Sequence, residues 1–127
     1  DLGTGSYNWK TKINSNLRPS LIGNYLFTIS IEGYLVVLEK NTGKIVRVTD
    51  IFKSFKKKTR NKIRPTGFIL GLNNIYLSTD NGRLIVIDVT TGKSISTLKI
   101  DKEKISRPII LDKNLYVVKD SAIIKLN

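Results

Sequence analysis

The sequence contains no cysteine and no histidine among its 127 residues. The absence of cysteine excludes disulfides, thiolate nucleophiles and metal sites built on cysteine. The absence of histidine excludes a Ser-His-Asp triad, a histidine general base and histidine metal ligands. No apolar run approaches the ~20 residues that a membrane-spanning helix needs, and the first residues lack the pattern of a signal peptide. What remains is one globular domain or a piece of one, because domains usually take ~100–200 residues.

Acidic residues are scarce beside basic ones: 10 Asp and Glu stand against 22 Lys and Arg, which gives a net charge of +12. Such an excess favours an anionic partner, whether nucleic acid, a phospholipid surface or an acidic protein. A solvated, lysine-rich surface without a selected role is the competing interpretation. One cluster exceeds the background, and its seven basic residues are Lys53, Lys56, Lys57, Lys58, Arg60, Lys62 and Arg64. Such a run is normally exposed and mobile unless an anion compensates it.

Two short phrases each occur three times in the chain, which indicates an internal repeat. The first phrase ends in Thr-Gly and occupies residues 1–5, 39–43 and 88–92. The second is Arg-Pro, at residues 18–19, 64–65 and 107–108, and each copy precedes an apolar stretch and then a strand with an aromatic residue at its centre. That aromatic residue is Phe27, Tyr76 or Tyr116. Because phenylalanine replaces tyrosine at this position, packing explains it better than hydroxyl chemistry does.

Each unit of the repeat is typical of β-strands, with short segments rich in Ile, Val, Leu, Tyr and Thr between turn residues. Asn81-Gly82 and Asp120-Ser121 suit tight hairpin turns, and Arg-Pro suits the start of a strand. No stretch shows a convincing helical period. Four strands in a ~40-residue unit describe a β-propeller blade. The sequence therefore predicts an all-β fold, namely a β-propeller fragment of about three four-stranded antiparallel blades that form an incomplete ring.

The repeat divides a single partial domain, residues 1–127, into five parts. They are residues 1–14, the last strand of a preceding blade; 15–51, a blade; 52–64, a basic insertion; 65–101, a blade; and 102–127, a last blade lacking its outer strand. Propellers use ~4–8 blades, so about three cannot close a ring. Two explanations stay open. Either the chain is the C-terminal part of a longer propeller, or two copies form a homo-oligomer head to tail, with a strand at residues 7–13 completing the partner's last blade.

The pattern Asp-x-x-Thr-Gly-x-x-x-Trp stands complete once, in residues 1–9, and ends in Trp9. It resembles the blade motif of the PQQ-like, quinoprotein-type β-propellers. Residues 106–126 resemble the C-terminal part of the BamB-type outer-membrane assembly lipoproteins. The resemblance implies that Trp9 docks one blade onto its neighbour. The other copies of the repeat replace this tryptophan by Arg47 and Ser96.

The same resemblance argues against an enzyme. Quinoprotein dehydrogenases hold a PQQ cofactor with calcium, and a calcium shell takes ~6–8 oxygen ligands. Few carboxylates are free for it, because those at turns or strand ends usually bond turn backbone. These carboxylates are Glu32, Glu39, Asp80, Asp88, Asp112 and Asp120. We expect no catalytic residue, no cofactor, no metal ligand and no enzyme activity, and a degenerate PQQ-dependent dehydrogenase is the least favoured alternative.

The leading hypothesis is a non-enzymatic scaffold for protein–protein interaction, because rigid blades present loops that carry recognition. The BamB resemblance implies an accessory of outer-membrane β-barrel protein assembly. It would be periplasmic and outer-membrane-associated through an anchor upstream of this sequence. Candidate contacts to a protein partner are Arg18, Arg64 and Arg107, expected at equivalent loop positions on one end of the ring. The competing interpretation is that these arginines bond carboxylates or carbonyls of neighbouring blades.

An alternative hypothesis is that the basic insertion binds an anionic membrane surface. Its candidate residues are Lys53, Lys56, Lys57, Lys58, Arg60 and Lys62. The apolar residues Phe52, Phe55 and Ile63 lie among them, and they either pack the insertion down or dip into a membrane interface. Nucleic acid is disfavoured as a partner because stacking aromatic residues are sparse there.

Overall fold

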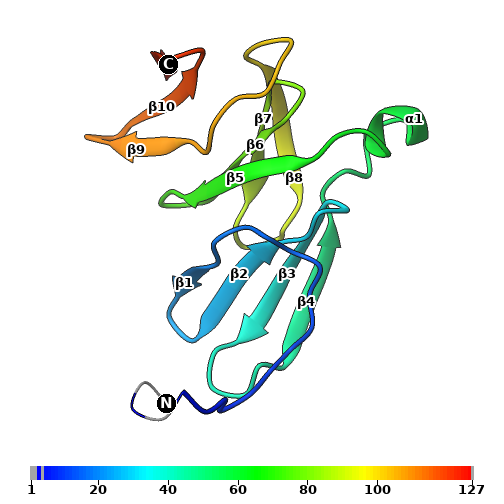
Figure 1. Cartoon of the computed structure of the whole chain (residues 1–127), viewed down its shortest axis with the longest axis vertical. Helices are drawn as coiled ribbons and strands as arrows, with labels where there is room; N and C mark the ends of the chain where they lie inside the picture. Colours follow the sequence, from blue (N-terminus) through cyan, green and yellow to red (C-terminus); the bar gives the residue numbers. More distant parts are fainter. Residues whose placement is uncertain (1–2, 4, 127) are drawn as a thin grey trace.

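The structure is a computed structural model that describes residue 3 and residues 5–126 as three antiparallel sheets (Figure 1). The first sheet has the order β1 (Ser20–Ile22), β2 (Tyr25–Ile29), β3 (Tyr34–Glu39) and β4 (Ile45–Asp50). The second has the order β5 (Pro65–Leu70), β6 (Asn74–Thr79), β7 (Arg83–Asp88) and β8 (Ser94–Lys99). The third consists of β9 (Ile109–Leu111), β10 (Asn114–Lys119) and β11 (Ala122–Leu126). Strands pair only with their chain neighbours, as in propeller blades, which confirms the predicted all-β class.

The three sheets follow one another without closing a ring, and the two ends of the chain lie at opposite ends of the molecule (Figure 1). Each Arg-Pro phrase stands at the first strand of a sheet, since β1 begins after Pro19, β5 begins at Pro65 and β9 begins after Pro108. Proline is tolerated there because its missing N–H costs no ladder hydrogen bond at the start of a strand. The phrase therefore marks where each blade begins.

Tight turns join β6 to β7 and β10 to β11 where the sequence predicts them. Gly82, between β6 and β7, has a φ of +76°, a conformation that glycine adopts without a Cβ clash. Between β10 and β11, Asp120 and Ser121 take φ values of +50° and +64°. Two successive residues of positive φ form the turn that suits the right-handed twist of a hairpin. The last sheet thus makes the same connection without glycine.

One cluster of buried apolar side chains joins the first sheet, the basic insertion and the second sheet. Its members are Phe27, Ile29, Leu35, Val37, Ile51, Phe52, Ile63, Phe68, Ile75, Leu77, Ile85 and Ile87. Within the strands the members lie two residues apart, because alternate side chains of a strand share one face. The first two blades therefore share one hydrophobic core, to which the insertion contributes side chains.

Two features differ from the sequence-based expectations. Residues 7–13, expected to form a strand, belong to no strand, because a ladder needs a neighbouring strand and the described residues offer them none. Residues Lys57–Arg60 form a short helix, α1, although the sequence shows no helical period; four residues are too few to display one. Within the described ranges, no helix is long and apolar enough to cross a membrane.

Candidate functional site

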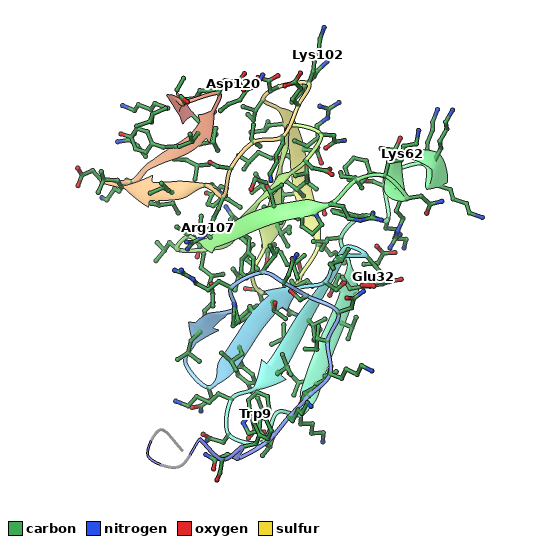
Figure 2. All side chains as sticks on the ribbon, in the orientation of Figure 1. Trp9, Glu32, Lys62, Lys102, Arg107 and Asp120 are labelled. Atoms are coloured by element: carbon green, nitrogen blue, oxygen red, sulfur yellow. The ribbon has the colours of Figure 1, made fainter. Side chains whose placement is uncertain are left out.

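Trp9 connects the N-terminal segment to the turn that follows β3 (Figure 2). Its indole Nε1 donates a hydrogen bond to the Lys40 carbonyl oxygen at 2.7 Å. Its ring lies against Gly43, where an added Cβ would clash with the indole. Thr11 completes the contact by donating its hydroxyl to the Gly43 carbonyl oxygen. Trp9 thus contacts the neighbouring blade, at the turn formed by the Thr-Gly phrase, but it does so from a segment that forms no blade of its own.

Arg47 makes the same connection one repeat later, between the first and second sheets. Its Nη2 donates to the Val89 carbonyl oxygen at 3.0 Å, and its Nη1 donates to the Thr90 carbonyl oxygen at 2.6 Å. Val89 and Lys40 hold the same position in the repeat, so Arg47 and Trp9 reach equivalent carbonyls. Sequence reasoning treated position 47 only as a lost tryptophan. The signal for its role was the threonine that stands two residues after both docking residues.

Arg107 contacts the blade that precedes it. Its Nε donates to the Phe68 carbonyl oxygen in β5 at 3.1 Å, and its side chain lies so close to Gly67 that a Cβ there would clash. Bonding to a neighbouring blade, the competing interpretation of the arginines, therefore holds for Arg107. Arg64 differs, because its Nη1 donates to carbonyls of its own loop at 2.9 and 3.1 Å.

Arg18 has an exposed side chain. Together with Arg107 it lines a pocket of about 210 Å³, to which β5 contributes residues 66–68. Arg64 does not line this pocket. The structure thus brings two of the three predicted arginines to one place and leaves the third in the insertion.

The basic insertion is held down by its apolar side chains. Phe52 and Ile63, near its two ends, are 0% and 1% exposed. Phe55 meets Phe52 edge to face, with ring centroids 5.6 Å apart, and Phe52 covers Gly33 in the turn before β3 so closely that no Cβ fits there. Of the two roles left open by the sequence, packing is the one observed for Phe52 and Ile63.

An ion pair ties the insertion to the end of β4. Arg60 Nη1 donates to Asp50 Oδ2 at 2.7 Å, and the guanidinium lies 5.5 Å from the centre of the Tyr34 ring. The hydrogen bond to Asp50 raises the pKa of Arg60 above its ordinary value. Because this guanidinium is used within the protein, Arg60 is the member of the basic cluster least available to a partner.

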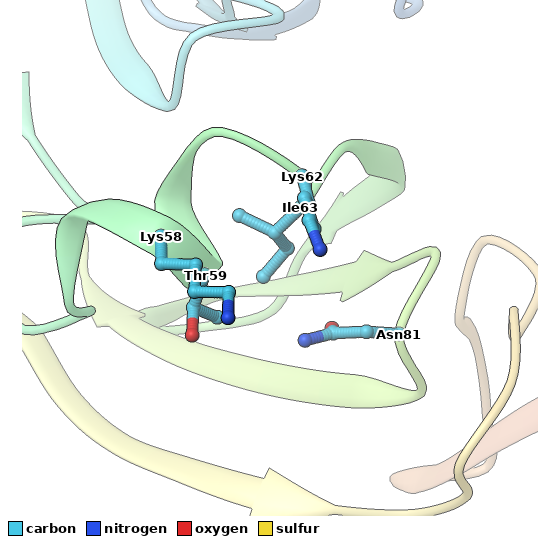
Figure 3. Close-up of a pocket in the computed structure, with 5 residues that line it drawn as sticks. All are labelled: Lys58, Thr59, Lys62, Ile63 and Asn81. Carbon is cyan, nitrogen blue, oxygen red and sulfur yellow. The ribbon is translucent and has the colours of Figure 1, made fainter.

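The lysines of the insertion face solvent, and none of them forms an ion pair in the part of the chain that the structure describes. Lys58 and Lys62 line a pocket of about 280 Å³ (Figure 3). Thr59, Ile63 and Asn81 complete it. Lys53, Lys56 and Lys57 are exposed outside this pocket. Sequence reasoning missed Thr59 and gave Asn81 a turn-forming role alone, because their approach depends on how the insertion folds back.

The acidic side chains at turns are engaged locally. Asp80 Oδ1 accepts the Arg64 backbone N–H at 2.8 Å, and Asp88 Oδ1 accepts a turn N–H at 2.9 Å. The side-chain amide of Asn14 donates to Glu32 and lowers the pKa of that carboxyl. Across residues 5–126, no three acidic side chains gather where a metal ion would bind.

Solved structures with this arrangement of sheets are β-propellers. BamB from Moraxella catarrhalis superposes with a TM-score of 0.73 over 98% of this chain at 15% sequence identity. The chain has the fold of a PQQ-like, BamB-type propeller fragment. It spans 35% of the length of that BamB chain. No protein-family model matches the sequence, and no curated protein matches it.

Two further propellers show how widely the fold is used. The quinohemoprotein alcohol dehydrogenase ADHIIG from Pseudomonas putida HK5 matches 86% of this chain with a TM-score of 0.62 and 14% identity, and 17% of its own length is covered. The Cps50 (Swd1) β-propeller domain from Myceliophteria thermophila matches 74% with a TM-score of 0.60 and 18% identity, and 31% of its length is covered. At these identities the likeness concerns the fold alone, which an alcohol dehydrogenase and a Swd1 domain both carry.

Proposed function

We propose that the chain belongs to a non-enzymatic β-propeller scaffold that binds another protein during outer-membrane β-barrel protein assembly. The observation that carries the proposal is the superposition on BamB, which includes 98% of this chain at a TM-score of 0.73. A periplasmic, outer-membrane-associated location is part of the same proposal. Asp80 and Asp88 accept hydrogen bonds from backbone N–H groups, the structural use of turn carboxylates that a scaffold requires.

The pocket beside Arg18 is the place where we expect the protein partner to contact these blades. Arg107 Nε donates its hydrogen bond to the Phe68 carbonyl oxygen. The two terminal nitrogens of its guanidinium therefore remain for a ligand in the pocket that Arg107 lines. Two guanidinium groups at one hollow favour a carboxylate, because a planar guanidinium binds both carboxylate oxygens at once. Arg64 stays a candidate contact outside the pocket, with only one of its terminal nitrogens bonded to its own loop.

Surface plasmon resonance tests the proposal with the full chain and purified outer-membrane β-barrel assembly machinery. We expect saturable binding that Arg18→Ala weakens by roughly tenfold, as for a central arginine of an interface. Arg18→Lys keeps the charge but loses the two-pronged geometry, so it is expected to weaken binding as well. Lys44→Ala removes one exposed positive charge elsewhere and serves as the control. An absence of saturable binding by the unmodified chain contradicts the proposed function.

A further inference from the structure

We propose that the pocket between the basic insertion and the β6–β7 turn binds a phosphate monoester group. Lys58, Thr59 and Lys62 contribute to it from α1 and the residues just after it, and Asn81 contributes from the turn of the next blade. In Figure 3 the nitrogen ends of Lys58, Lys62 and Asn81 border one space, with Thr59 and Ile63 beside it. The site is independent of the Arg18 pocket and of any protein partner.

The lining of this pocket offers hydrogen-bond donors and positive charge, with no acidic side chain among its residues. Each lysine ammonium brings three donors and no acceptor, and the threonine hydroxyl can donate as well. The Asn81 side-chain oxygen already accepts the Thr79 hydroxyl at 2.6 Å, which leaves its amide nitrogen as the group available to a ligand. Two cations and two neutral donors match the several acceptor oxygens of a doubly charged phosphate monoester.

Two carboxylates of neighbouring segments are already paired with cations of the protein, and a third, Asp80 beside Asn81, accepts the Arg64 backbone N–H at 2.8 Å. Asp50 is bound by Arg60 at 2.7 Å. Asp101, whose main chain lies against the turn glycine next to Asn81, binds Lys119 at 2.5 Å. Within the described part of the chain, neither Lys58 nor Lys62 takes part in an ion pair. The ammonium groups of Lys58 and Lys62 are therefore available to an anion from solution.

The walls of the pocket are anchored on both sides. On one side Ile63 is 1% exposed and belongs to the core, which fixes the residues that carry Lys62. On the other side Arg83 Nη1 donates to the Asn81 carbonyl oxygen at 3.0 Å, in addition to the bond from Thr79. Groups held in place before binding lose less conformational freedom when a ligand arrives. Ile63 and Asn81 therefore fix the two sides of the pocket, between which the side chains of Lys58 and Lys62 are free to close on a ligand.

The size of the pocket restricts the ligand class. Its volume of about 280 Å³ lies just below the ~300–1,000 Å³ of typical small-molecule sites. A phosphate group with a small substituent suits such a space. The same group is offered by free sugar or glycerol phosphates and by the headgroup of phosphatidic acid, so the experiment needs one arm for each source.

The first arm titrates the ¹⁵N-labelled full chain with inorganic phosphate and with glycerol 3-phosphate at constant ionic strength. We expect saturable NMR shifts confined to residues 58–63 and 79–83. Lys58→Gln together with Lys62→Gln is expected to weaken binding by at least about tenfold. Lys53→Gln together with Lys57→Gln removes the same charge from the same insertion outside the pocket, and it is expected to change binding by less than about twofold. Asn81→Asp keeps a turn-forming side chain but turns a donor into an anion, so binding should be lost.

The second arm measures sedimentation with vesicles that carry either phosphatidic acid, a monoester, or phosphatidylglycerol, a diester. A preference for phosphatidic acid that disappears in the Lys58/Lys62 variant identifies the lipid as a source, whereas saturable shifts without that preference identify soluble phosphates. Equal weakening by the two double variants shows a diffuse basic field and overturns the pocket. The absence of both saturable shifts and a phosphatidic acid preference overturns it too.

Discussion

Trp9 and Arg47 perform the same task in successive repeats with chemically unrelated side chains. The indole covers Gly43 with apolar surface and makes one hydrogen bond, whereas the guanidinium makes two. The docking of Trp9 could be predicted because the motif names tryptophan. The role of Arg47 could not be predicted, because the turn needs only a side chain that can donate hydrogen bonds to its carbonyls. Several residue types can do so, and the motif names tryptophan alone. The role of a residue could therefore be predicted where the motif specifies its type, and it was missed where only the length and hydrogen-bonding capacity of the side chain decide the contact.

Removing the Arg47 side chain should loosen the joint between the first two blades. We expect Arg47→Ala to lower the free energy of unfolding by about 1–3 kcal/mol, because two carbonyls lose their donors. Arg47→Trp should stay within about 1 kcal/mol of the unmodified chain, since it restores the side chain used at position 9 and removes an Nε that is buried without a partner. Urea unfolding followed by circular dichroism measures both, with the exposed Lys44→Ala as control. An Arg47→Ala chain of unchanged stability would show that the contact contributes nothing.

At the scale of elements, strands and their starting points were predictable, while the placement of the insertion was not. The run of lysines predicts solvent exposure, and the lysines are exposed. The burial of Phe52 depends on Gly33, which lies in a different hairpin. The approach of Asn81 to Lys62 likewise depends on the next blade. Such contacts join segments that are distant in sequence, so a local sequence pattern does not predict which residues will meet.

An ion pair outside the insertion connects the second and third sheets. Asp101, in the segment after β8, binds Lys119 at the end of β10 at 2.5 Å. Lys119 lowers the pKa of Asp101, and Asp101 raises the pKa of Lys119. A lowered carboxyl pKa stabilises the fold above the ordinary value of 3.8 and stops doing so as the pH falls through the lowered pKa. A raised lysine pKa stabilises below 10.5 and stops as the pH rises through the raised pKa.

The joint between the second and third sheets should therefore weaken in acid. We expect the unmodified chain to be more stable than Asp101→Asn at neutral pH, because the variant lacks the charge that attracts Lys119. This advantage should shrink as the pH falls below the ordinary carboxyl value of 3.8 and through the lowered pKa of Asp101. Urea unfolding across that range gives the difference directly. A difference that stays constant with pH would mean that the carboxylate charge does not contribute.

At the scale of the whole molecule, the repeat predicted three blades and an open ring, and both are observed. The fourth strand expected at residues 7–13 is missing because pairing needs a neighbour. The third sheet shows the same incompleteness from the other side. Ile109, Leu111 and Ile123 are 51%, 60% and 75% exposed there, and β11 is an edge strand. Apolar surface and an unpaired edge together favour association.

We expect the isolated chain to pair head to tail, with residues 7–13 of one copy lying along β11 of another. Size-exclusion chromatography with light scattering should give twice the mass of one chain. Lys12→Pro removes a backbone donor from the new ladder and should shift the protein toward single copies, whereas Lys12→Ala should not. A monodisperse single copy of the unmodified chain contradicts the pairing, and the segment at 7–13 would then await a strand from elsewhere in a longer propeller.

Trp9 and Arg47 each form a joint between two repeats: the side chain that donates the hydrogen bond lies in one repeat, and the turn that accepts it lies in the next. The first blade therefore carries half of two different joints, namely the turn that receives Trp9 and the Arg47 side chain that contacts the next turn. Duplication of this blade within the gene would insert a unit that brings both halves it needs, and its deletion would leave Trp9 facing the turn that now receives Arg47. The number of blades can thus change by whole units while every other part of the protein keeps its sequence.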